Sequence, residues 1–404
     1  MRWYRQPPER ANPAKDTVAS GLGPHWHPPP TALTPWAMAL FPPSSCARLV
    51  VKIGSALLVA PDGTVRRDWL AGLVADIAER HRAGQQIAIV SSGAIALGAR
   101  RLGLPRGGRA SLEDAQAAAA TGQIVLSQTW AELLGGQNIT AAQMLVTLDD
   151  LEHRRRYLNA AATLGRLLGL GIVPVINEND SVATEEIRFG DNDRLAARIA
   201  QAAGAGGVVL LSDVDGLYDA NPHTNPAAQH IARVETIDAV AGMADAGSAS
   251  GMGSGGMVSK IAAARIATSA GTHLAIASGR IDHPLATEAR HTLFVAAHAA
   301  PARKAWLAGG LTARGAIHVD AGAARALAEG GSLLAAGATR VEGRFDRGDL
   351  VTIEGPRGTI ARGLCEYDAA DAARLLGRRS DEQAAILGYA PRAALVHRNH
   401  LALL

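Results

Sequence analysis

The chain of 404 residues is poor in cysteine and in aromatic residues, and it has no long hydrophobic run. Its two cysteines, Cys46 and Cys365, lie far apart and fit no metal-binding spacing, so neither a disulfide framework nor a zinc site is expected. So few cysteines favour a reducing, cytoplasmic location. The absence of any stretch of about 18 consecutive apolar residues argues against a membrane span. With 4% aromatic and 48% hydrophobic residues, the core must be aliphatic, and fibrous or wholly disordered classes are excluded.

Outside residues 1–43, the chain also lacks a strong excess of either positive or negative charge. The formal net charge is +3, and +2 of it lies in residues 1–43. The remainder is close to neutral, so composition gives no electrostatic signature of a nucleic-acid or membrane partner. The 13 histidines are scattered, and no Ser-His-Asp or Cys-His arrangement indicates nucleophilic catalysis.

Lysine is scarce as well, with four lysines against 36 arginines. Lys52 lies inside an apolar run, and Lys260 ends the glycine-rich stretch SGMGSGGMVSK. In a chain that uses arginine as its general cation, these two lysines indicate phosphoryl groups, because a compact ammonium fits beside a phosphoryl oxygen. The alternative is chance placement at a strand end and a helix end.

The glycine-rich stretch at 250–260 should lead directly into a helix. Backbone N–H groups in such a loop form an anion site at the helix N-terminus. Because no strand precedes the stretch, it fails the context of a dinucleotide fingerprint, and Ile261 after Lys260 fails the Walker A pattern. A flexible linker is the alternative, although a linker does not require a lysine at its end.

Alternating strand and helix patterns begin near residue 49. Short apolar runs predict strands covered on both faces at residues 49–53, 86–90, 140–146, 172–176, 207–211 and 273–277. Helix-like stretches lie at residues 67–82, 112–134, 149–168, 192–203 and 256–270. This alternation predicts an α/β fold with a mainly parallel sheet and helices on both sides. Residues 181–189 alternate in polarity and predict a small hairpin.

Changes in composition predict the domain boundaries. Residues 1–43 hold ten of the 19 prolines, so we expect an irregular, disordered extension over 1–45, unless the assigned start is too long and Met38 begins the protein. The α/β domain is expected over 46–300, followed by a linker over 301–312. A small β-rich domain is expected over 313–404, with strands at 317–319, 340–344, 350–353, 359–363 and 393–397.

Polar residues gather where the expected strands end, which is where open α/β sheets bind their ligands. They are Lys52, Gly54 and Ser55; Ser91, Ser92 and Gly93; Asn177, Glu178, Asn179 and Asp180; and Ser212 and Asp213. Any one of them could be a simple turn residue. Their concentration at one edge of the sheet indicates a site.

Three carboxylates lie close together in the sequence beside amide side chains. Asp180, Asp191 and Asp193 are near Asn177, Asn179 and Asn192. Such a group could hold the ammonium of an amino acid, position a lysine or share Mg²⁺. For Asp191, capping of the helix that follows is the alternative.

Seven motifs follow one another from about residue 49 to the C-terminal region. They are VVKIGS at 50–55, IVSSGAIALG at 89–98, PVINENDSVAT at 174–184, FGDNDRL at 189–195, LLSDVDGLYDANP at 210–222, GMGSGGMVSK at 251–260 and ILGY at 386–389. In this order they are similar to the motifs of the glutamate 5-kinases of the amino-acid kinase superfamily. The resemblance implies a three-layer αβα sandwich around a mainly parallel sheet, with a small β-rich PUA domain at the C-terminus.

The resemblance also implies a role for each matching residue. The catalytic residues would be Lys52, Lys260 and Asp193, with Asp193 orienting the lysines. The residues that bind glutamate would be Ser92, Gly93, Asn177, Asp180 and Asn192. The residues that bind ATP would be Lys52, Gly54, Ser212, Asp213, Ser254, Gly255, Gly256, Met257, Val258, Ser259 and Lys260. No residue is assigned to a metal, and Mg²⁺ is implied together with ATP.

The implied reaction is ATP-dependent phosphorylation of the side-chain carboxylate of L-glutamate, the first step of proline biosynthesis. Because a carboxylate is already ionised at neutral pH, the reaction needs alignment and charge neutralisation rather than a general base. The family also implies a homo-oligomer, either a dimer or a tetramer, and feedback inhibition by L-proline. A sister kinase acting on aspartate or N-acetylglutamate is the alternative. Ala56 and Val258 depart from the family pattern, which puts a side-chain contact to phosphate in doubt.

The C-terminal stretches GGSLLAAG at 330–337 and VEGRFDRGDLV at 341–351 are similar to PUA domains, which often occur in RNA-modifying enzymes. An RNA-binding protein is therefore the alternative from another functional class. Residues 311–404 carry twelve Arg and eleven Asp plus Glu. Binding to RNA phosphates would favour a clear basic excess, so a structural or regulatory module is expected instead.

Overall fold

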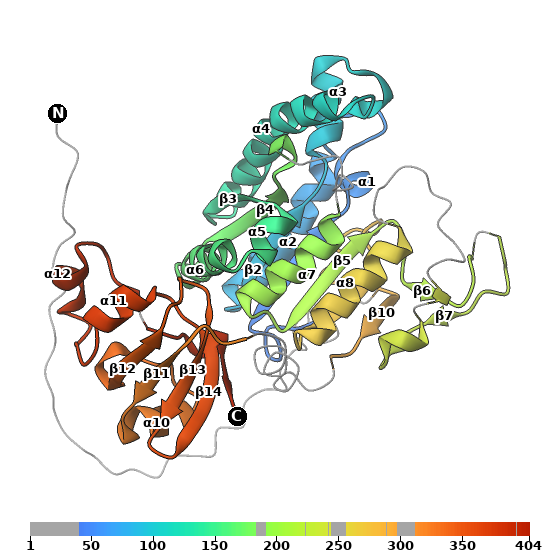
Figure 1. Cartoon of the computed structure of the whole chain (residues 1–404). Coiled ribbons are helices and arrows are strands. Elements are labelled where there is room, and N and C mark those ends of the chain that lie inside the picture. The colour runs from blue at the N-terminus through green and yellow to red at the C-terminus, as the bar shows by residue number, and fades with distance from the viewer. Residues whose placement is uncertain are drawn as a thin grey trace, which may run out of the picture. The chain divides into compact units, whose positions relative to one another are not determined.

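The computed structural model describes residues 40–182, 191–222, 224–240, 242–243, 256–287, 289–296, 312–392 and 394–404. Its larger part is built on an eight-stranded sheet with the order β3-β4-β2-β1-β5-β9-β10-β8 (Figure 1). The strands, in chain order, are β1 Arg48–Ile53, β2 Gln86–Ser91, β3 Ala141–Val146, β4 Val173–Glu178, β5 Gly207–Ser212, β8 Arg233–Val234, β9 His273–Ser278 and β10 His291–Phe294. A separate two-stranded ribbon joins β6 Leu217–Tyr218 to β7 His230–Ile231.

The sheet is parallel except where β10 pairs with β9. The six strands that the sequence predicts are confirmed to within two residues at each end. Their continuous apolar runs reflect burial on both faces, since β4 and β5 are buried at every position.

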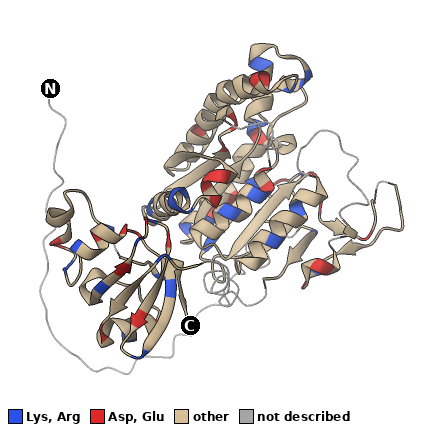
Figure 2. Cartoon of the chain, in the orientation of Figure 1, with Lys and Arg blue, Asp and Glu red and all other residues tan. Residues whose placement is uncertain are grey.

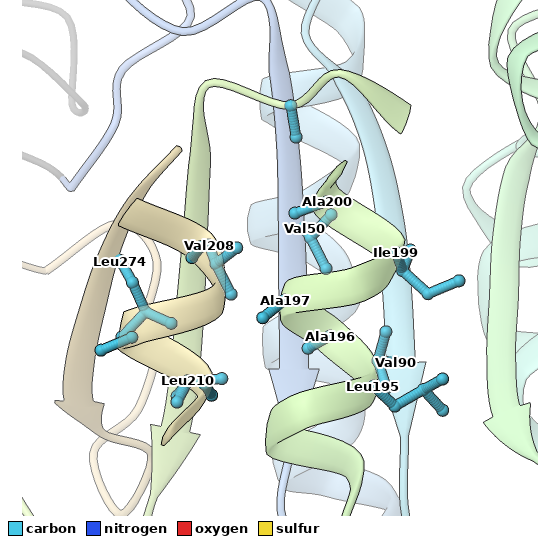
Figure 3. Close-up of a cluster of buried hydrophobic side chains, with 14 of the residues drawn as sticks. Val50, Val90, Leu195, Ala196, Ala197, Ile199, Ala200, Val208, Leu210 and Leu274 are labelled. Atoms are coloured by element: carbon cyan, nitrogen blue, oxygen red, sulfur yellow. The ribbon is translucent and has the colours of Figure 1, made fainter. Parts of the chain in front are cut away.

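Helices cover both faces of this sheet, which confirms the three-layer arrangement. Val50 of β1 packs with Leu195 into a core beneath the helices α6 Arg154–Gly169, α7 Asn192–Ala203 and α8 Met257–Ser269 (Figure 3). The next residue, Val51, points the other way and packs with Trp130 into a second core beneath α2 Arg67–Arg82 and α4 Leu112–Gly136. This period of two along a strand divides the aliphatic side chains between two buried layers.

The helices of this part run in the order α1 Ser55–Leu58, α2 Arg67–Arg82, α3 Ala94–Leu102, α4 Leu112–Gly136, α5 Leu148–Glu152, α6 Arg154–Gly169, α7 Asn192–Ala203 and α8 Met257–Ser269. The prediction of one helix over 149–168 is wrong, because His153 is extended and separates α5 from α6. A capping box between Thr147 and Asp150 starts α5 on its own. The hairpin predicted over 181–189 is also not found where it can be examined: Asp180–Val182 form a 3₁₀ turn, and residues 183–189 lie outside the described residues.

The C-terminal part has its own five-stranded sheet with the order β12-β11-β13-β14-β15 and its own apolar core. Its elements are β11 Gly315–Val319, α10 Ala321–Ala328, β12 Ala338–Gly343, β13 Leu350–Gly355, β14 Gly358–Leu364, α11 Ala369–Arg374, α12 Gln383–Leu387 and β15 Leu401–Leu403. The strand predicted over 393–397 is wrong. Ala394, Leu395 and Val396 are buried, but Val396 makes only an isolated bridge to Leu333, and the sheet is completed by β15 instead.

Within the described ranges, no helix is long and apolar enough to cross a membrane.

Candidate active site

The candidate site lies at the carboxyl edge of the eight-stranded sheet. Strands β1, β2, β4 and β5 are parallel neighbours in this sheet, so the residues at their carboxyl ends meet at one edge. Lys52 lies near the end of β1, and Ser92 directly follows β2. Asn177 is the second-last residue of β4, and Ser212 is the last residue of β5. The sequence prediction that these polar residues share one edge is thus met by the topology.

Two lysines and one carboxylate form a buried ion bridge on one side of the site. The Lys52 Nζ lies 2.6 Å from Asp193 Oδ1, and the Lys260 Nζ lies 2.9 Å from Asp193 Oδ2. The three side chains are only 9%, 6% and 1% exposed for Lys52, Lys260 and Asp193. One carboxylate therefore holds both scarce lysines, and the trio keeps an excess of one positive charge.

The electrostatics of the trio follow from burial and close pairing. Burial lowers the pKa of Lys52, and the negative charge of Asp193 opposes this. Burial alone would raise the pKa of Asp193, but Lys52 and Lys260 outweigh it and hold this pKa below its usual value. Asp193 therefore stays ionised and continues to orient the two ammonium groups.

The helices that carry Asp193 and Lys260, α7 and α8, are joined at their first turns. Asp191 caps α7 by accepting a hydrogen bond from the backbone N–H of Arg194, as the helix-capping interpretation expects. The Ser259 hydroxyl on α8 donates a second hydrogen bond to the Asp191 carboxylate. The positive ends of the α7 and α8 dipoles thus lie beside the lysines, which adds to an anion site.

A chain of amide hydrogen bonds lies on the other side of the site. Asn192 Nδ2 donates to Ser92 Oγ at 2.8 Å and to Asn177 Oδ1 at 3.1 Å. Asn177 Nδ2 in turn donates to Gln123 Oε1 on α4 at 2.9 Å. The structure thus brings together three of the five residues predicted to bind glutamate, and adds Gln123.

Two buried oxygen atoms in this half have no hydrogen-bond partner among the described residues. They are Asn192 Oδ1 and Asp180 Oδ1. Asn192 is 2% exposed and Asp180 is 6% exposed. Burial raises the pKa of Asp180 to about 6, and the charge of Arg109 opposes this shift. Because buried polar atoms are normally paired, two unpaired acceptors in one site indicate a ligand that donates hydrogen bonds.

A cavity of about 270 Å³ opens beside Asp180 and beside Asn177, the hydrogen-bond partner of Asn192. It is lined by Asn177, Asp180 and Gln123, together with residues of α4, β3 and the turn after β4. The cavity is large enough for several water molecules and for a small polar molecule.

Three of the remaining predicted residues, Gly54, Gly93 and Ser212, lie at the strand ends. Gly93 has φ +106° and directly precedes α3, and a Cβ there would approach Val59 at 3.2 Å, so this turn after Ser92 requires glycine. Gly54 donates its N–H to the Leu211 carbonyl and links β1 to β5. Ser212 Oγ donates to Asp213 Oδ1 at 3.1 Å.

The predicted nucleotide loop is only partly described. Gly256 caps α8, and the side chain of Met257 packs against the apolar core rather than facing the site. Val258 is 52% exposed. Ser254 and Gly255 lie outside the described residues. The nucleotide contacts expected of residues 254–260 remain predictions, and Ser259 is the one whose hydroxyl already has a protein partner.

Sequence reasoning missed two residues that support the site from α4. Gln123 ends the amide chain, and the buried indole of Trp130 donates to Ser91 Oγ at 2.9 Å, next to Ser92. A sequence signal for Gln123 existed, since it is a polar residue in an alanine-rich helix, directly after Gly122. Its partner could not be known before the fold brought α4 against β4.

The fold is an open α/β sheet between two layers of helices, with a lysine-lined anion site beside a small polar cavity. This combination defines an enzyme that transfers phosphoryl groups. Residues 47–278 match the Amino acid kinase family, and residues 315–387 match the PUA domain. The glutamate 5-kinase of Sphingopyxis alaskensis is 74% identical over 369 residues, covering 91% of this chain and 100% of that protein. The glutamate 5-kinase of Zymomonas mobilis is 62% identical over 371 residues, covering 91% and 94%. The chain belongs to the amino acid kinase family, in its glutamate 5-kinase branch, and is a phosphotransferase with a carboxyl group as acceptor.

Proposed function

We propose that the chain transfers the γ-phosphoryl group of ATP to the side-chain carboxylate of L-glutamate, giving L-glutamyl 5-phosphate as the first step of proline biosynthesis. One observation carries the proposal. Asn192 and Asp193 are consecutive residues in the first turn of α7, where Asn192 joins the amide chain and Asp193 holds Lys52 and Lys260. A single helix start therefore aligns the polar cavity with the lysine pair.

The lysine trio supplies what this reaction requires of the protein. A glutamate carboxylate is ionised at neutral pH, so its oxygen attacks the γ-phosphorus without a general base. The bond from phosphorus to the β,γ-bridging oxygen then breaks, and negative charge moves onto ADP. Lys52 and Lys260, held by Asp193, lie where they neutralise charge on the transferring and departing phosphates, while the N-terminus of α8 binds phosphate oxygens.

The unpaired acceptors favour glutamate over the sister substrate N-acetylglutamate. Asp180 and Asn192 each offer a buried oxygen, and a free ammonium donates up to three hydrogen bonds. An acetylated nitrogen carries one N–H and no charge, so it would leave Asp180 ionised and unpaired in a buried site, which is costly. Aspartate has the ammonium but a side chain one methylene shorter, so its carboxylate would fall short of the phosphate.

Enzymes of this family use ATP with a divalent metal, and we assign Mg²⁺ to that role. In the part of the chain that the structure describes, no three or more His, Cys, Asp or Glu side chains gather to hold a metal ion. Mg²⁺ typically keeps several waters and binds through substrate phosphates and one or two carboxylates. The Asp213 carboxylate, 36% exposed, accepts a hydrogen bond from Ser212 and lies 3.9 Å from Arg280, and it would be the carboxylate that holds the ion. When bound, the ion adds positive charge at the phosphates.

Three further expectations accompany this proposal. The family implies a homo-oligomer, a dimer or tetramer, and feedback inhibition by L-proline. Both cysteines, Cys46 and Cys365, are unpaired and buried, which supports a cytoplasmic location.

The test is an assay with ATP, Mg²⁺ and one of three acids: glutamate, aspartate or N-acetylglutamate. Hydroxylamine traps any acyl phosphate that forms. We expect trapped product with glutamate alone. Product with another acid instead would keep the mechanism and reject the substrate, and no product with any acid would reject the proposed function.

One variant tests whether the activity depends on the lysine pair of the candidate site. Lys260→Ala should abolish turnover, because it removes one of the two cations at the phosphates, while glutamate binding measured by calorimetry stays within about threefold. Near-normal turnover in this variant would remove Lys260 from the catalytic residues.

A further inference from the structure

Gln123 lies at the end of the amide chain and on the wall of the candidate acceptor cavity. Its Oε1 accepts the hydrogen bond from Asn177 Nδ2 at 2.9 Å. It comes from α4, whereas the residues assigned to substrate lie at strand ends or on α7. Gln123 therefore brings a hydrogen-bond acceptor from the helix layer to a site formed mainly by the strand ends and α7.

The hydrogen bonds of the chain run in one direction. Because Asn177 uses its Nδ2 on Gln123, it presents Oδ1 to Asn192. Asn192 must then use its Nδ2 on Asn177 and Ser92, which leaves its Oδ1 buried and without a partner among the described residues. The acceptor that Gln123 provides thus determines which atom Asn192 turns toward the ligand.

The opposite direction would give the opposite chemistry. If Asn177 inverted, its Nδ2 would meet the Nδ2 of Asn192, and two donors cannot pair. Asn192 would then invert as well and present its Nδ2 where its Oδ1 now lies. A donor at that position would repel an ammonium instead of accepting from it. The observed direction instead leaves two acceptors, Asn192 Oδ1 and Asp180 Oδ1, for a cationic donor.

We propose that Gln123 is a positioning residue for substrate selection: by accepting from Asn177 it orients Asn192, so that the site selects amino acids with a free ammonium. This rests on the proposed glutamate site. Gln123 acts through Asn177 and touches none of the reacting atoms, so it should affect glutamate affinity and leave the phosphoryl-transfer step and ATP affinity unchanged.

Two substitutions at this position separate positioning from packing. Gln123→Met keeps an unbranched side chain of similar length and removes the acceptor. Gln123→Glu keeps an acceptor at the same place, and an ionised carboxylate has no donor with which to reverse the chain. The matched control is Gln128→Met on the same helix, where Gln128 bonds Glu132 on the exposed face.

The experiment measures KM for glutamate, KM for ATP and kcat in the full chain. It also measures competitive inhibition by glutarate, which has both carboxylates and no ammonium. We expect Gln123→Met to raise KM for glutamate about threefold to tenfold, the effect of losing one neutral hydrogen bond. KM for ATP, kcat and the inhibition constant of glutarate should stay within about twofold. Gln128→Met should resemble the unsubstituted chain, and Gln123→Glu, which retains the acceptor, should raise KM for glutamate less than Gln123→Met does.

Several results would overturn the proposal. One is an unchanged KM for glutamate in Gln123→Met. Another is an equal loss of glutarate binding, since glutarate does not use the ammonium acceptors. A third is a loss in Gln123→Glu as large as in Gln123→Met. The unsubstituted chain distinguishes failure of this inference from failure of the proposed function. If the unsubstituted chain forms no glutamyl phosphate, the proposed function is rejected. If it has normal activity and Gln123→Met is unaffected, only the inference about Gln123 is rejected.

Discussion

At the scale of single residues, the site depends on charged groups that the fold has buried. Asp193 is 1% exposed and stays ionised because two lysines lie within 3 Å of its oxygens. Asp180 is 6% exposed and has no such partner, which is why its pKa rises to about 6. The two carboxylates therefore have opposite shifts, and only Asp180 titrates near physiological pH.

This contrast predicts a pH dependence of glutamate binding. Below a pH of about 6, Asp180 takes up a proton and loses the charge that would hold the substrate ammonium. We expect kcat/KM for glutamate to fall about tenfold for each pH unit below that value, because kcat/KM reports groups of the free enzyme. KM for ATP should show no transition there. Initial rates at pH 5 to 8 check this.

Asp180→Asn is the matching variant. It keeps the shape of the side chain and removes the titration, so kcat/KM for glutamate should be lower by about tenfold to a hundredfold, the range for a hydrogen bond to a charged group, and should lose its acid limb. An acid limb that persists in Asp180→Asn would assign the transition to another group.

The same residues show how far sequence reasoning reaches. The scarcity of lysine pointed to Lys52 and Lys260 before any fold was known, because residue usage is visible in sequence. Gln123 was missed, because its role depends on α4 lying beside β4. Ser259 was assigned to ATP, yet its hydroxyl already donates to Asp191, a contact between two helix starts that are 68 residues apart in the chain.

At the scale of elements, α3 and α4 cross with almost no space between their backbones. A Cβ at Gly98 would lie 1.8 Å from the Ala118 carbonyl oxygen, and a Cβ at Gly122 would lie 1.8 Å from the Ala94 carbonyl oxygen. α3 starts directly after Ser92 and Gly93, and Gly122 precedes Gln123. The crossing therefore sets the distance between the β2 turn and the amide chain.

We expect Gly122→Ala to force the two helices apart. Overpacking of this kind costs about 1–3 kcal/mol of unfolding free energy, and it should also raise KM for glutamate by displacing Gln123. Urea denaturation and initial rates measure the two effects.

Gly135→Ala on the same helix is the control, because no atom lies within 4 Å of a Cβ built there. Alanine is the better helix former, so this variant should be neutral or more stable by about 0.5–1 kcal/mol. Equal stabilities for the two variants would mean that the helices separate without cost, contrary to the close crossing.

The elements themselves were predictable to different degrees. Buried parallel strands are continuous apolar runs, so their positions follow from sequence to within two residues. The break at His153 was not visible, because the helical pattern continues on both sides of it. The apolar stretch at 393–397 resembles a strand by composition alone, and only the competition for partners in the C-terminal sheet shows that β15 takes that place.

At the scale of the whole molecule, the distribution of charge in the C-terminal part argues against RNA binding as the function. Figure 2 shows basic and acidic positions interspersed over the C-terminal part, and every basic one is an arginine. The ion pairs Arg340–Glu342, Arg347–Glu366 and Arg374–Asp371 use several of its arginines within the domain. With twelve Arg against eleven Asp plus Glu, the C-terminal part has little net positive charge with which to neutralise a row of phosphates.

We accordingly expect the full chain to bind single-stranded RNA weakly and with little dependence on salt. Each phosphate neutralised contributes about −0.7 to the slope of log K against log salt for a single strand, so a protein that neutralises several phosphates shows a slope of several units. Fluorescence anisotropy of a labelled RNA at salt concentrations from about 50 to 200 mM measures this slope. A slope shallower than about −1 supports a structural or regulatory role for the C-terminal part. A steep slope with tight binding would show a basic surface that the balance of twelve Arg against eleven Asp plus Glu does not predict, and would make RNA a partner of this kinase.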